Sequence, residues 1–490
     1  MSSSNTRTLC CDFQQNSDYA GGACCGRVPV VECDVLVIGA GAAGLTAAAS
    51  IRDQKLRVFL LEKDEYVGGT TFRSGGCMWM PYNPRMQEQG IEDSRELAER
   101  YIRAVRNAKD EGRDPDPVQE HLWNRWLEVY LTQGPQMMDY LQGEGFRWMA
   151  APSAIPNYHD QHGAVKFGRT LDPEVFDAVS LGDWLRYLPP QDDTPVIRRF
   201  EDIFTLTRPP YSVDGAASVA PPHTAVKPLS MGRSLVAQLL KICKDHNNVN
   251  IWTKCELREL QYCEMGHRVT GARIQCGRRE SLIDIRASLG VVLTTGGFSQ
   301  NQEMRDTYVK VGLTKGTNPQ VSSKTEWSLA APSDMGIALQ VGQKLGADTA
   351  QLDQVWGIPT MIDPATGKSR EAMFAITKPF SIVTDTQGFR FFSESQPYGV
   401  AVRSMYKRAR EVPEGGAFWL IFDNTYMQRY SIGGLAGQAS VNQAVSNGFL
   451  FCSETIRGLS DQILDHDHNL EATVDECWKY QGFPSHHDQS

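Results

Sequence analysis

Residues 33–44 read CDVLVIGAGAAG, an apolar run followed by three glycines at fixed spacing, and this stretch decides the fold. Its apolar part, Val35–Ile38, is typical of a strand buried on both faces of a parallel sheet. The Ala-rich sequence from Ala42 to Arg52 predicts a helix, and the run Val58–Leu61 predicts the next buried strand. Together these elements predict one βαβ unit.

The three glycines Gly39, Gly41 and Gly44 form the pattern Gly-x-Gly-x-x-Gly between the first strand and the helix. This pattern alone occurs often by chance, but here it follows a buried strand and opens a helix. Glu62 ends the next strand roughly 20 residues later, where an acid can hold a ribose hydroxyl. The unpaired N–H groups and positive dipole end of the helix N-terminus favour a pyrophosphate. We therefore expect a dinucleotide at this turn.

A second glycine-rich segment, residues 68–76 (GGTTFRSGG), follows soon after Glu62 and lets the backbone pack against a flat ring, which favours FAD over NAD. A third glycine pair, Gly296-Gly297, ends an apolar run. It resembles the end of another strand that contacts the same cofactor, although buried strands often end in glycine. The residues expected to contact the cofactor are Gly39, Ala40, Gly41, Ala43, Gly44, Glu62, Lys63, Gly69, Thr70, Thr71, Ser74, Gly75, Gly76, Gly296 and Gly297.

Length and composition narrow the class of protein. A chain of 490 residues exceeds the size of one hydrophobic core, so two or more domains are expected. The 58 acidic and 49 basic residues give a net charge of -9, which argues against a nucleic-acid partner. No apolar run approaches the ~20 residues that cross a bilayer, and residues 1–32 do not resemble a secretory signal. These features predict a soluble, cytosolic protein.

The 12 cysteines are scattered along the chain, which favours reduced thiols over a disulfide framework. The adjacent pairs Cys10-Cys11 and Cys24-Cys25 lack the spacing of zinc ligands, so no metal site is expected.

With these elements in place, the chain resembles the fumarate reductase and succinate dehydrogenase flavoprotein superfamily. Within it the 3-ketosteroid Δ1-dehydrogenases are most similar, over roughly residues 31–480. Residues 74–84, SGGCMWMPYNP, resemble that family's Ser-Gly-Gly-x-x-Trp-x-Pro-x-Asn-Pro segment. Residues 231–235, MGRSL, resemble its Met-Gly-Arg-x-Leu.

The resemblance implies an α/β fold in which a Rossmann-type FAD-binding domain carries an inserted α+β substrate (cap) domain. The expected division is a flexible leader over residues 1–32, the FAD-binding domain over 33–300, the cap over 301–455, and a shortened return toward the FAD domain over 456–490.

Residues 388–398, GFRFFSESQPY, are similar to the ketosteroid family's Gly-x-Arg-Phe-x-Asn-Glu-x-x-Pro-Tyr. The resemblance implies that Tyr398 is the base that removes a proton beside the ring ketone, while flavin accepts hydride from the next carbon. An ordinary core or surface tyrosine is the alternative. A phenol has an unperturbed pKa near ~10, so a base of this kind needs a neighbour that stabilises its anion. The family uses a second tyrosine, for which Tyr158 matches best and Tyr140 is the alternative.

Two departures from the superfamily bear on the cofactor and on activity. Covalent flavoproteins carry a His within the segment that corresponds to residues 70–74, where this chain has Arg73, so non-covalent FAD is implied. Family members continue beyond the point that matches residues 470–480, and nothing from Cys477 onward resembles that continuation. The missing part normally supplies hydrogen-bond donors to the steroid ketone.

Three functions therefore stay open at this stage. The leading one is a ketosteroid Δ1-dehydrogenase-like enzyme that uses a steroid or triterpenoid ketone and an external electron acceptor. A fumarate reductase-like enoate reductase is the second, with Arg390 and Arg403 as the nearby cations. The third is an inactive, truncated FAD-binding remnant that acts through interaction.

Overall fold

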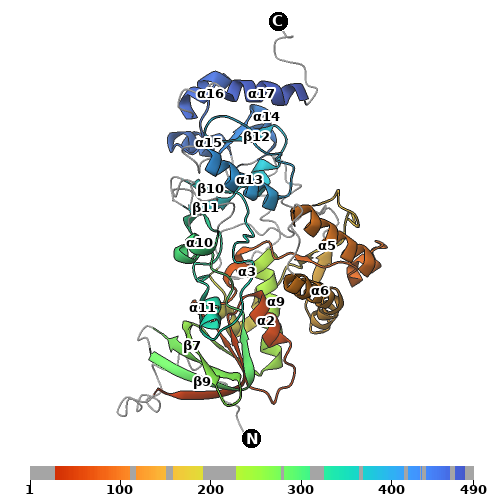
Figure 1. Cartoon of the computed structure of the whole chain (residues 1–490), viewed down its shortest axis with the longest axis vertical. Coiled ribbons are helices and arrows are strands. Elements are labelled where there is room, and N and C mark those ends of the chain that lie inside the picture. The colour runs from red at the N-terminus through yellow and green to blue at the C-terminus, as the bar shows by residue number, and fades with distance from the viewer. Residues whose placement is uncertain are drawn as a thin grey trace. The chain divides into compact units, whose positions relative to one another are not determined.

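The structure is a computed structural model, and its described residues form two compact units (Figure 1). The first unit comprises Met1–Ile203, Ala216–Gln300 and Ala330–Thr349, and the second comprises Phe204–Gly215, Asn301–Leu329 and Ala350–Ser490. The residues that the structure describes are 28–110, 117–150, 158–190, 228–277, 281–309, 325–363, 368–412, 418–430, 432, 437–463 and 469–480. The cysteine pairs near the N-terminus lie outside these residues.

A six-stranded sheet forms the centre of the first unit, in the order β6-β2-β1-β9-β8-β7. Neighbouring strands run parallel from β6 to β9, and β8 and β7 continue the sheet antiparallel. The strand bounds are β1 (Val30–Ile38), β2 (Val58–Leu61), β6 (Val249–Trp252), β7 (Cys255–Cys263), β8 (Arg268–Cys276) and β9 (Ser281–Leu293). All residues of β2 are buried, as a parallel strand covered on both faces requires.

Helices α2 (Ala42–Ala49) and α9 (Met231–His246) pack side by side in the first unit (Figure 1). A Cβ on Gly44 would lie 1.8 Å from the oxygen of Gly39, so only glycine lets α2 begin this close to β1. A Cβ on Gly232 would lie 2.0 Å from the oxygen of Thr71, in the short helix α3 (Gly69–Arg73). These close approaches fix α2 and α9 against the glycine-rich segments.

The predicted βαβ unit is confirmed, with differences at its edges. Strand β1 begins at Val30, inside the expected leader, because residues from Val30 onward pair with the N-terminal half of β9. Residues 281–293 form one continuous strand, β9. Strand β7 was not predicted, since a register shift between Leu257 and Glu259 breaks its alternation of buried and exposed residues.

Helices α5 (Arg95–Asp110) and α6 (Pro117–Gly143) account for most of the described part of residues 93–147. The Pro-rich region after residue 150 is described only in part. Its described residues include strand β5 (Thr170–Pro173) and the 3-10 segment η2 (Ala178–Tyr187). Strand β5 pairs with β3 (Met78–Trp79) and β4 (Trp148–Ala150) in a small antiparallel sheet. The strands of this sheet come from segments that lie far apart in the sequence.

The second unit mixes short antiparallel strand pairs with helices. Its strands are β10 (Thr360–Asp363) with β11 (Lys368–Glu371), and β12 (Ser381–Thr384) with β13 (Trp419–Phe422). Its helices are α10 (Gln302–Tyr308), α12 (Met373–Ile376), α13 (Tyr398–Glu411), α14 (Asn424–Arg429), α15 (Gly437–Ser446), α16 (Ile456–Ile463) and α17 (Asn469–Tyr480). The predicted fold class, a Rossmann-type domain joined to an α+β domain, is confirmed.

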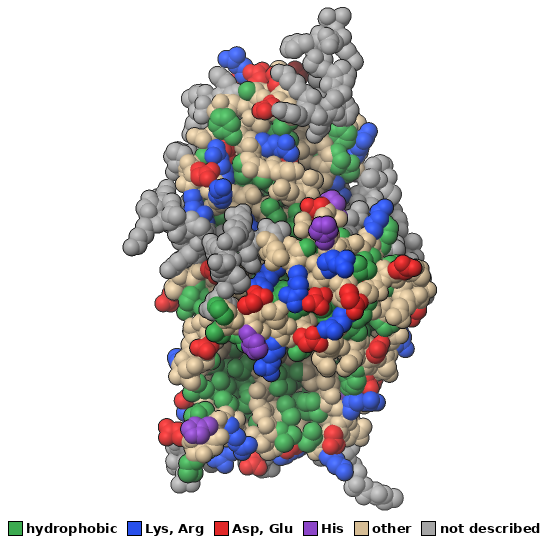
Figure 2. All heavy atoms as spheres, turned by 45° about the vertical axis from the view of Figure 1, so that its right-hand side comes forward, with side chains coloured by type: hydrophobic (Ala, Val, Ile, Leu, Met, Phe, Trp, Pro, Cys, Tyr) green, Lys and Arg blue, Asp and Glu red, His purple; other side chains and the backbone are tan. Residues whose placement is uncertain are grey.

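Charged side chains of both signs are interspersed on the face drawn in Figure 2. Within the part of the chain that the structure describes, the helices lack the combination of length and apolar character that a bilayer crossing needs.

Candidate active site

The first turn of the candidate cofactor site follows β1 directly. Gly39 has a φ of +103°, and a Cβ there would lie 2.3 Å from the oxygen of Thr294. Its backbone N–H donates to the oxygen of Leu61 at 2.8 Å, which joins the ends of β1 and β2. The turn therefore requires glycine, and it directs the chain into α2.

The N-terminus of α2 is open to a ligand. Its N-cap is Gly41, a residue without a side chain, and a Cβ there would meet nothing closer than Thr71 Oγ1 at 3.7 Å. Thr71 Oγ1 also accepts the N–H of Ala42 at 3.1 Å. Free room beside Gly41 at the positive end of a helix fits a pyrophosphate, as FAD supplies.

Glu62 lies at the end of β2 with its carboxylate buried beside the turn. One oxygen accepts the N–H of Ala40 at 3.1 Å and the other accepts the N–H of Asp64 at 2.9 Å. Burial raises the pKa of Glu62 above its usual value, although both hydrogen bonds lower it. Lys63, also predicted at the cofactor, pairs instead through Nζ with Glu256 Oε1 at 2.9 Å.

The second glycine-rich segment, with Gly69, Thr70, Thr71, Ser74, Gly75 and Gly76, lies against the same turn and the start of α9. The N–H of Gly68 donates to the oxygen of Ala40 at 2.8 Å. The N–H of Gly76 donates to Ser74 Oγ at 3.0 Å, and a Cβ on Gly76 would lie 2.4 Å from the carbonyl carbon of Met231. The structure thus brings together two of the three segments on which the family resemblance was based, residues 74–84 and 231–235.

The third glycine pair meets a residue that the sequence interpretation missed, Asp334. A Cβ on Gly296, whose φ is +74°, would lie 2.7 Å from Asp334 Oδ1. The hydroxyl of Thr70 donates to Asp334 Oδ2 at 2.6 Å and accepts the N–H of Ala331 at 2.8 Å. Burial raises the pKa of Asp334 despite the Thr70 bond.

A signal for Asp334 was present in the sequence. It lies in Ser333-Asp-Met-Gly336, just before helix α11 (Ile337–Lys344), and the N–H of Gly336 donates to the oxygen of Gly297 at 2.9 Å. An acid two residues before a glycine that opens a helix was the pattern to look for.

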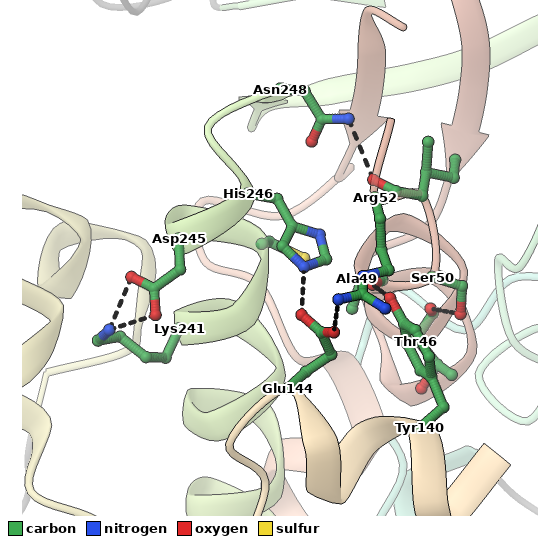
Figure 3. A network of polar contacts seen from close by, with 12 residues as sticks. Thr46, Ala49, Ser50, Arg52, Tyr140, Glu144, Lys241, Asp245, His246 and Asn248 are labelled. Atoms are coloured by element: carbon green, nitrogen blue, oxygen red, sulfur yellow. Dashed lines mark hydrogen bonds and ion pairs between the residues drawn. The ribbon is translucent and has the colours of Figure 1, made fainter. Parts of the chain in front are cut away.

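The two tyrosines considered as helpers have different surroundings. The hydroxyl of Tyr140 donates to the oxygen of Ala49 at 2.7 Å, and Arg52 stacks on its ring while pairing with Glu144 (Figure 3). Ala49 is the last residue of α2, at the opposite end from Gly41. Burial and the charge of Glu144 raise the pKa of Tyr140, which disfavours an anion there. Tyr140 therefore fastens α2 in place.

Tyr158 lies in a turn whose backbone is hydrogen-bonded to the phenol of Tyr101. The pKa of Tyr101 is raised by burial, which outweighs the Tyr158 bond and the charge of Arg169. Tyr158 thus belongs to the first unit, which also carries the glycine segments.

Tyr398 belongs to the second unit, where it is the first residue of α13 and Pro397 is the N-cap. Its phenolic oxygen accepts the indole N–H of Trp356 at 2.9 Å. The preceding loop is fixed by Glu394, which is buried, accepts the N–H of Val383 at 2.7 Å, and pairs with Arg390 at 2.6 Å. The Arg and Glu of the motif thus hold the loop that leads into Tyr398.

A helix that begins at a glycine N-cap beside two further glycine segments, at the end of a parallel strand, is typical of a flavoprotein oxidoreductase. The chain belongs to the FAD-binding domain family, whose profile matches residues 34–487. The predicted FAD-dependent oxidoreductase and its cofactor FAD are thereby confirmed.

Curated relatives and a solved structure support this membership. The 3-oxosteroid 1-dehydrogenase of Mycolicibacterium smegmatis is 30% identical over 451 residues, which are 88% of this chain and 74% of that protein. The 4-oxocyclohexanecarboxylate 2-dehydrogenase of Sinomonas cyclohexanicum is 28% identical over 459 residues, which are 90% of this chain and 72% of that protein. The crystal structure of 3-ketosteroid delta1-dehydrogenase from Sterolibacterium denitrificans, in complex with 1,4-androstadiene-3,17-dione, superposes with a TM-score of 0.77 at 26% identity. The match covers 92% of this chain and 79% of that one.

Proposed function

We propose that this chain is a ketone-activated dehydrogenase of the 3-ketosteroid Δ1-dehydrogenase type, which introduces a double bond beside a ring ketone. The names of the M. smegmatis and S. cyclohexanicum relatives both specify a cyclic ketone, a steroid in one and a monocyclic acid in the other. A steroid or triterpenoid ketone is the substrate we favour, and an external electron acceptor completes the turnover.

The observation that carries this proposal is the position of Tyr398. As the first residue of α13 it lies where the positive end of the helix dipole stabilises negative charge, and Trp356 donates a hydrogen bond to its oxygen. The indole N–H takes one lone pair of that oxygen and leaves another that can accept a proton from the substrate. We assign Tyr398 the role of taking the proton from the carbon beside the ketone, and Tyr158 the role of helper.

Bound FAD supplies the two-electron acceptor for the hydride that leaves the adjacent carbon. The open N-terminus of α2, Glu62 and the glycine segments would hold its pyrophosphate and ribose. We propose that FAD is bound non-covalently, because Arg73 occupies the segment in which covalent relatives carry a His. Acid precipitation should then release all yellow colour into the supernatant.

The enoate reductase alternative requires cations that are free to hold a dicarboxylate. Arg390 is instead engaged with Glu394, to which Nε and Nη2 both donate. Of the two cations named for this alternative only Arg403 is then left, and one cation does not match the two carboxylates of a dicarboxylate, so the geometry favours the dehydrogenase. Cytosolic residence stays a prediction of the sequence.

The test is anaerobic reduction of the purified yellow protein by 4-androstene-3,17-dione and, separately, by 4-oxocyclohexanecarboxylate. Either ketone should bleach the flavin absorbance, and Tyr398→Phe should abolish bleaching while it retains FAD. Tyr406→Phe, on the same helix α13, is the matched control and should bleach normally. A protein that neither ketone bleaches would favour the inactive remnant.

A further inference from the structure

The contact between Trp356 and Tyr398 joins residues 42 positions apart within the second unit. The indole nitrogen can only donate, so the phenolic oxygen is the acceptor, at 2.9 Å. The Trp356 side chain is otherwise 90% exposed, so its position does not result from burial in the core. Its indole N–H is directed at the residue proposed as the base.

The loop that carries Trp356 is packed against the helix that carries Tyr398. A Cβ on Gly357 would lie 2.9 Å from Val402 Cγ1, on α13, so the backbone at Gly357 approaches the helix as closely as glycine allows. Two residues further on, the oxygen of Pro359 accepts the N–H of Ala372 at 2.9 Å. The contact at Gly357 thus holds the backbone next to Trp356 close to α13.

A fixed donor has a specific consequence for a phenol that must lose and regain a proton. The N–H occupies one lone pair of the oxygen, which directs the hydroxyl proton and the remaining lone pair away from the indole. The same N–H stabilises the negative charge of the phenolate, the form of the side chain that takes a proton from the substrate. The first effect sets the direction from which the oxygen can take the substrate's proton, and the second maintains the deprotonated oxygen, so both act on the rate of proton abstraction.

We propose that Trp356 is a positioning residue for Tyr398: its indole N–H orients the phenolic oxygen and stabilises its deprotonated form, which then takes the substrate's proton. This inference rests on the proposed function, in which Tyr398 is the base. It assigns no contact between Trp356 and the substrate.

The test uses Trp356→Phe, which keeps an aromatic ring and deletes the donor. We expect kcat to fall about tenfold, the size of a lost hydrogen bond to a charged group, with KM unchanged. The kinetic isotope effect on kcat should increase with substrate deuterated at the carbon beside the ketone, because proton abstraction becomes slower than the other steps. Benzothienylalanine at position 356, which replaces only the N–H by sulfur, should reproduce both effects.

Matched controls separate this inference from the proposed function. Trp126→Phe removes another exposed indole, 63% accessible on α6, and should leave kcat and the isotope effect unchanged. If Tyr398→Phe is inactive but both position-356 variants match the unmodified protein, the positioning role is wrong and the proposed function stands. If Tyr398→Phe turns over normally, the proposed function fails, and the role of Trp356 fails with it.

Discussion

Arg169 and Asp93 form an ion pair in which the side chains are only 3% and 1% exposed, with Nη2 2.7 Å from Oδ1. Nε of Arg169 donates to the second carboxylate oxygen at 2.8 Å, so the pair is bidentate. The rings of Trp79 and Tyr101 lie against the guanidinium, at 5.6 and 5.3 Å from their centres. The ion pair therefore connects residues 74–84, which resemble the ketosteroid dehydrogenases, with Tyr101. The phenol of Tyr101 is hydrogen-bonded to the backbone of Tyr158.

Removing one partner of this pair should destabilise the protein strongly. Arg169→Met leaves the Asp93 carboxylate buried without its cation, which costs about 3–5 kcal/mol in free energy of unfolding. Urea denaturation measures this change. Arg268→Met, at an exposed position of β8, should change stability by less than about 0.5 kcal/mol.

The double variant Arg169→Met with Asp93→Leu should regain part of the lost stability, because no charge is left buried. A single variant as stable as the unmodified protein would show that water reaches Asp93.

Two glycines of the same turn should respond differently to one added methyl group. At Gly44 a Cβ would lie 1.8 Å from the Gly39 oxygen, so Gly44→Ala must move α2 away from β1 and should cost about 3 kcal/mol. At Gly41 the nearest atom is 3.7 Å away and φ is -79°, so Gly41→Ala should fold normally. Its methyl group would instead occupy the room proposed for the pyrophosphate.

Thermal denaturation of the apo-proteins and titration with FAD distinguish these effects. Gly41→Ala should keep the melting temperature and lose at least about tenfold in FAD affinity. Equal FAD affinity in Gly41→Ala would place the pyrophosphate elsewhere.

The sequence predicts the cofactor turn well and the rest of the site poorly, for a physical reason. The apolar run, the glycine pattern and Glu62 lie close together in the sequence. They meet at the cofactor turn because adjacent parallel strands end at the same edge of the sheet. The contacts of Asp334 with Thr70 and of Trp356 with Tyr398 join residues 264 and 42 positions apart. Such contacts depend on tertiary packing, which residue spacing does not encode.

Glu62 should give the apo-protein a distinctive pH dependence. Burial raises its pKa in the folded state above the usual value of 4.5, so the folded protein holds this proton more tightly than the unfolded chain. The stability that Glu62 contributes is therefore present at acid pH and declines as pH rises from about 4.5 through its folded pKa. Glu62→Gln cannot titrate and should lack this decline.

Urea denaturation of both apo-proteins across that pH range measures the difference between their slopes. The exposed Glu264→Gln is the control and should retain the slope of the unmodified protein. Identical slopes for Glu62→Gln and the unmodified protein would mean that Glu62 is not desolvated in solution.

Asp334 should contribute to FAD binding although it lies outside the glycine pattern. Its carboxylate accepts the Thr70 hydroxyl and faces the Gly296 backbone, where a cofactor hydroxyl would find a charged acceptor. Asp334→Ala should weaken FAD binding by about ten- to a hundredfold, the range for hydrogen bonds to a charged group. Thr70→Val removes the hydroxyl donated to Asp334 but keeps the carboxylate, so it should weaken binding less. Fluorescence titration with FAD ranks the two variants, and a larger loss for Thr70→Val than for Asp334→Ala would assign the main contact to the threonine.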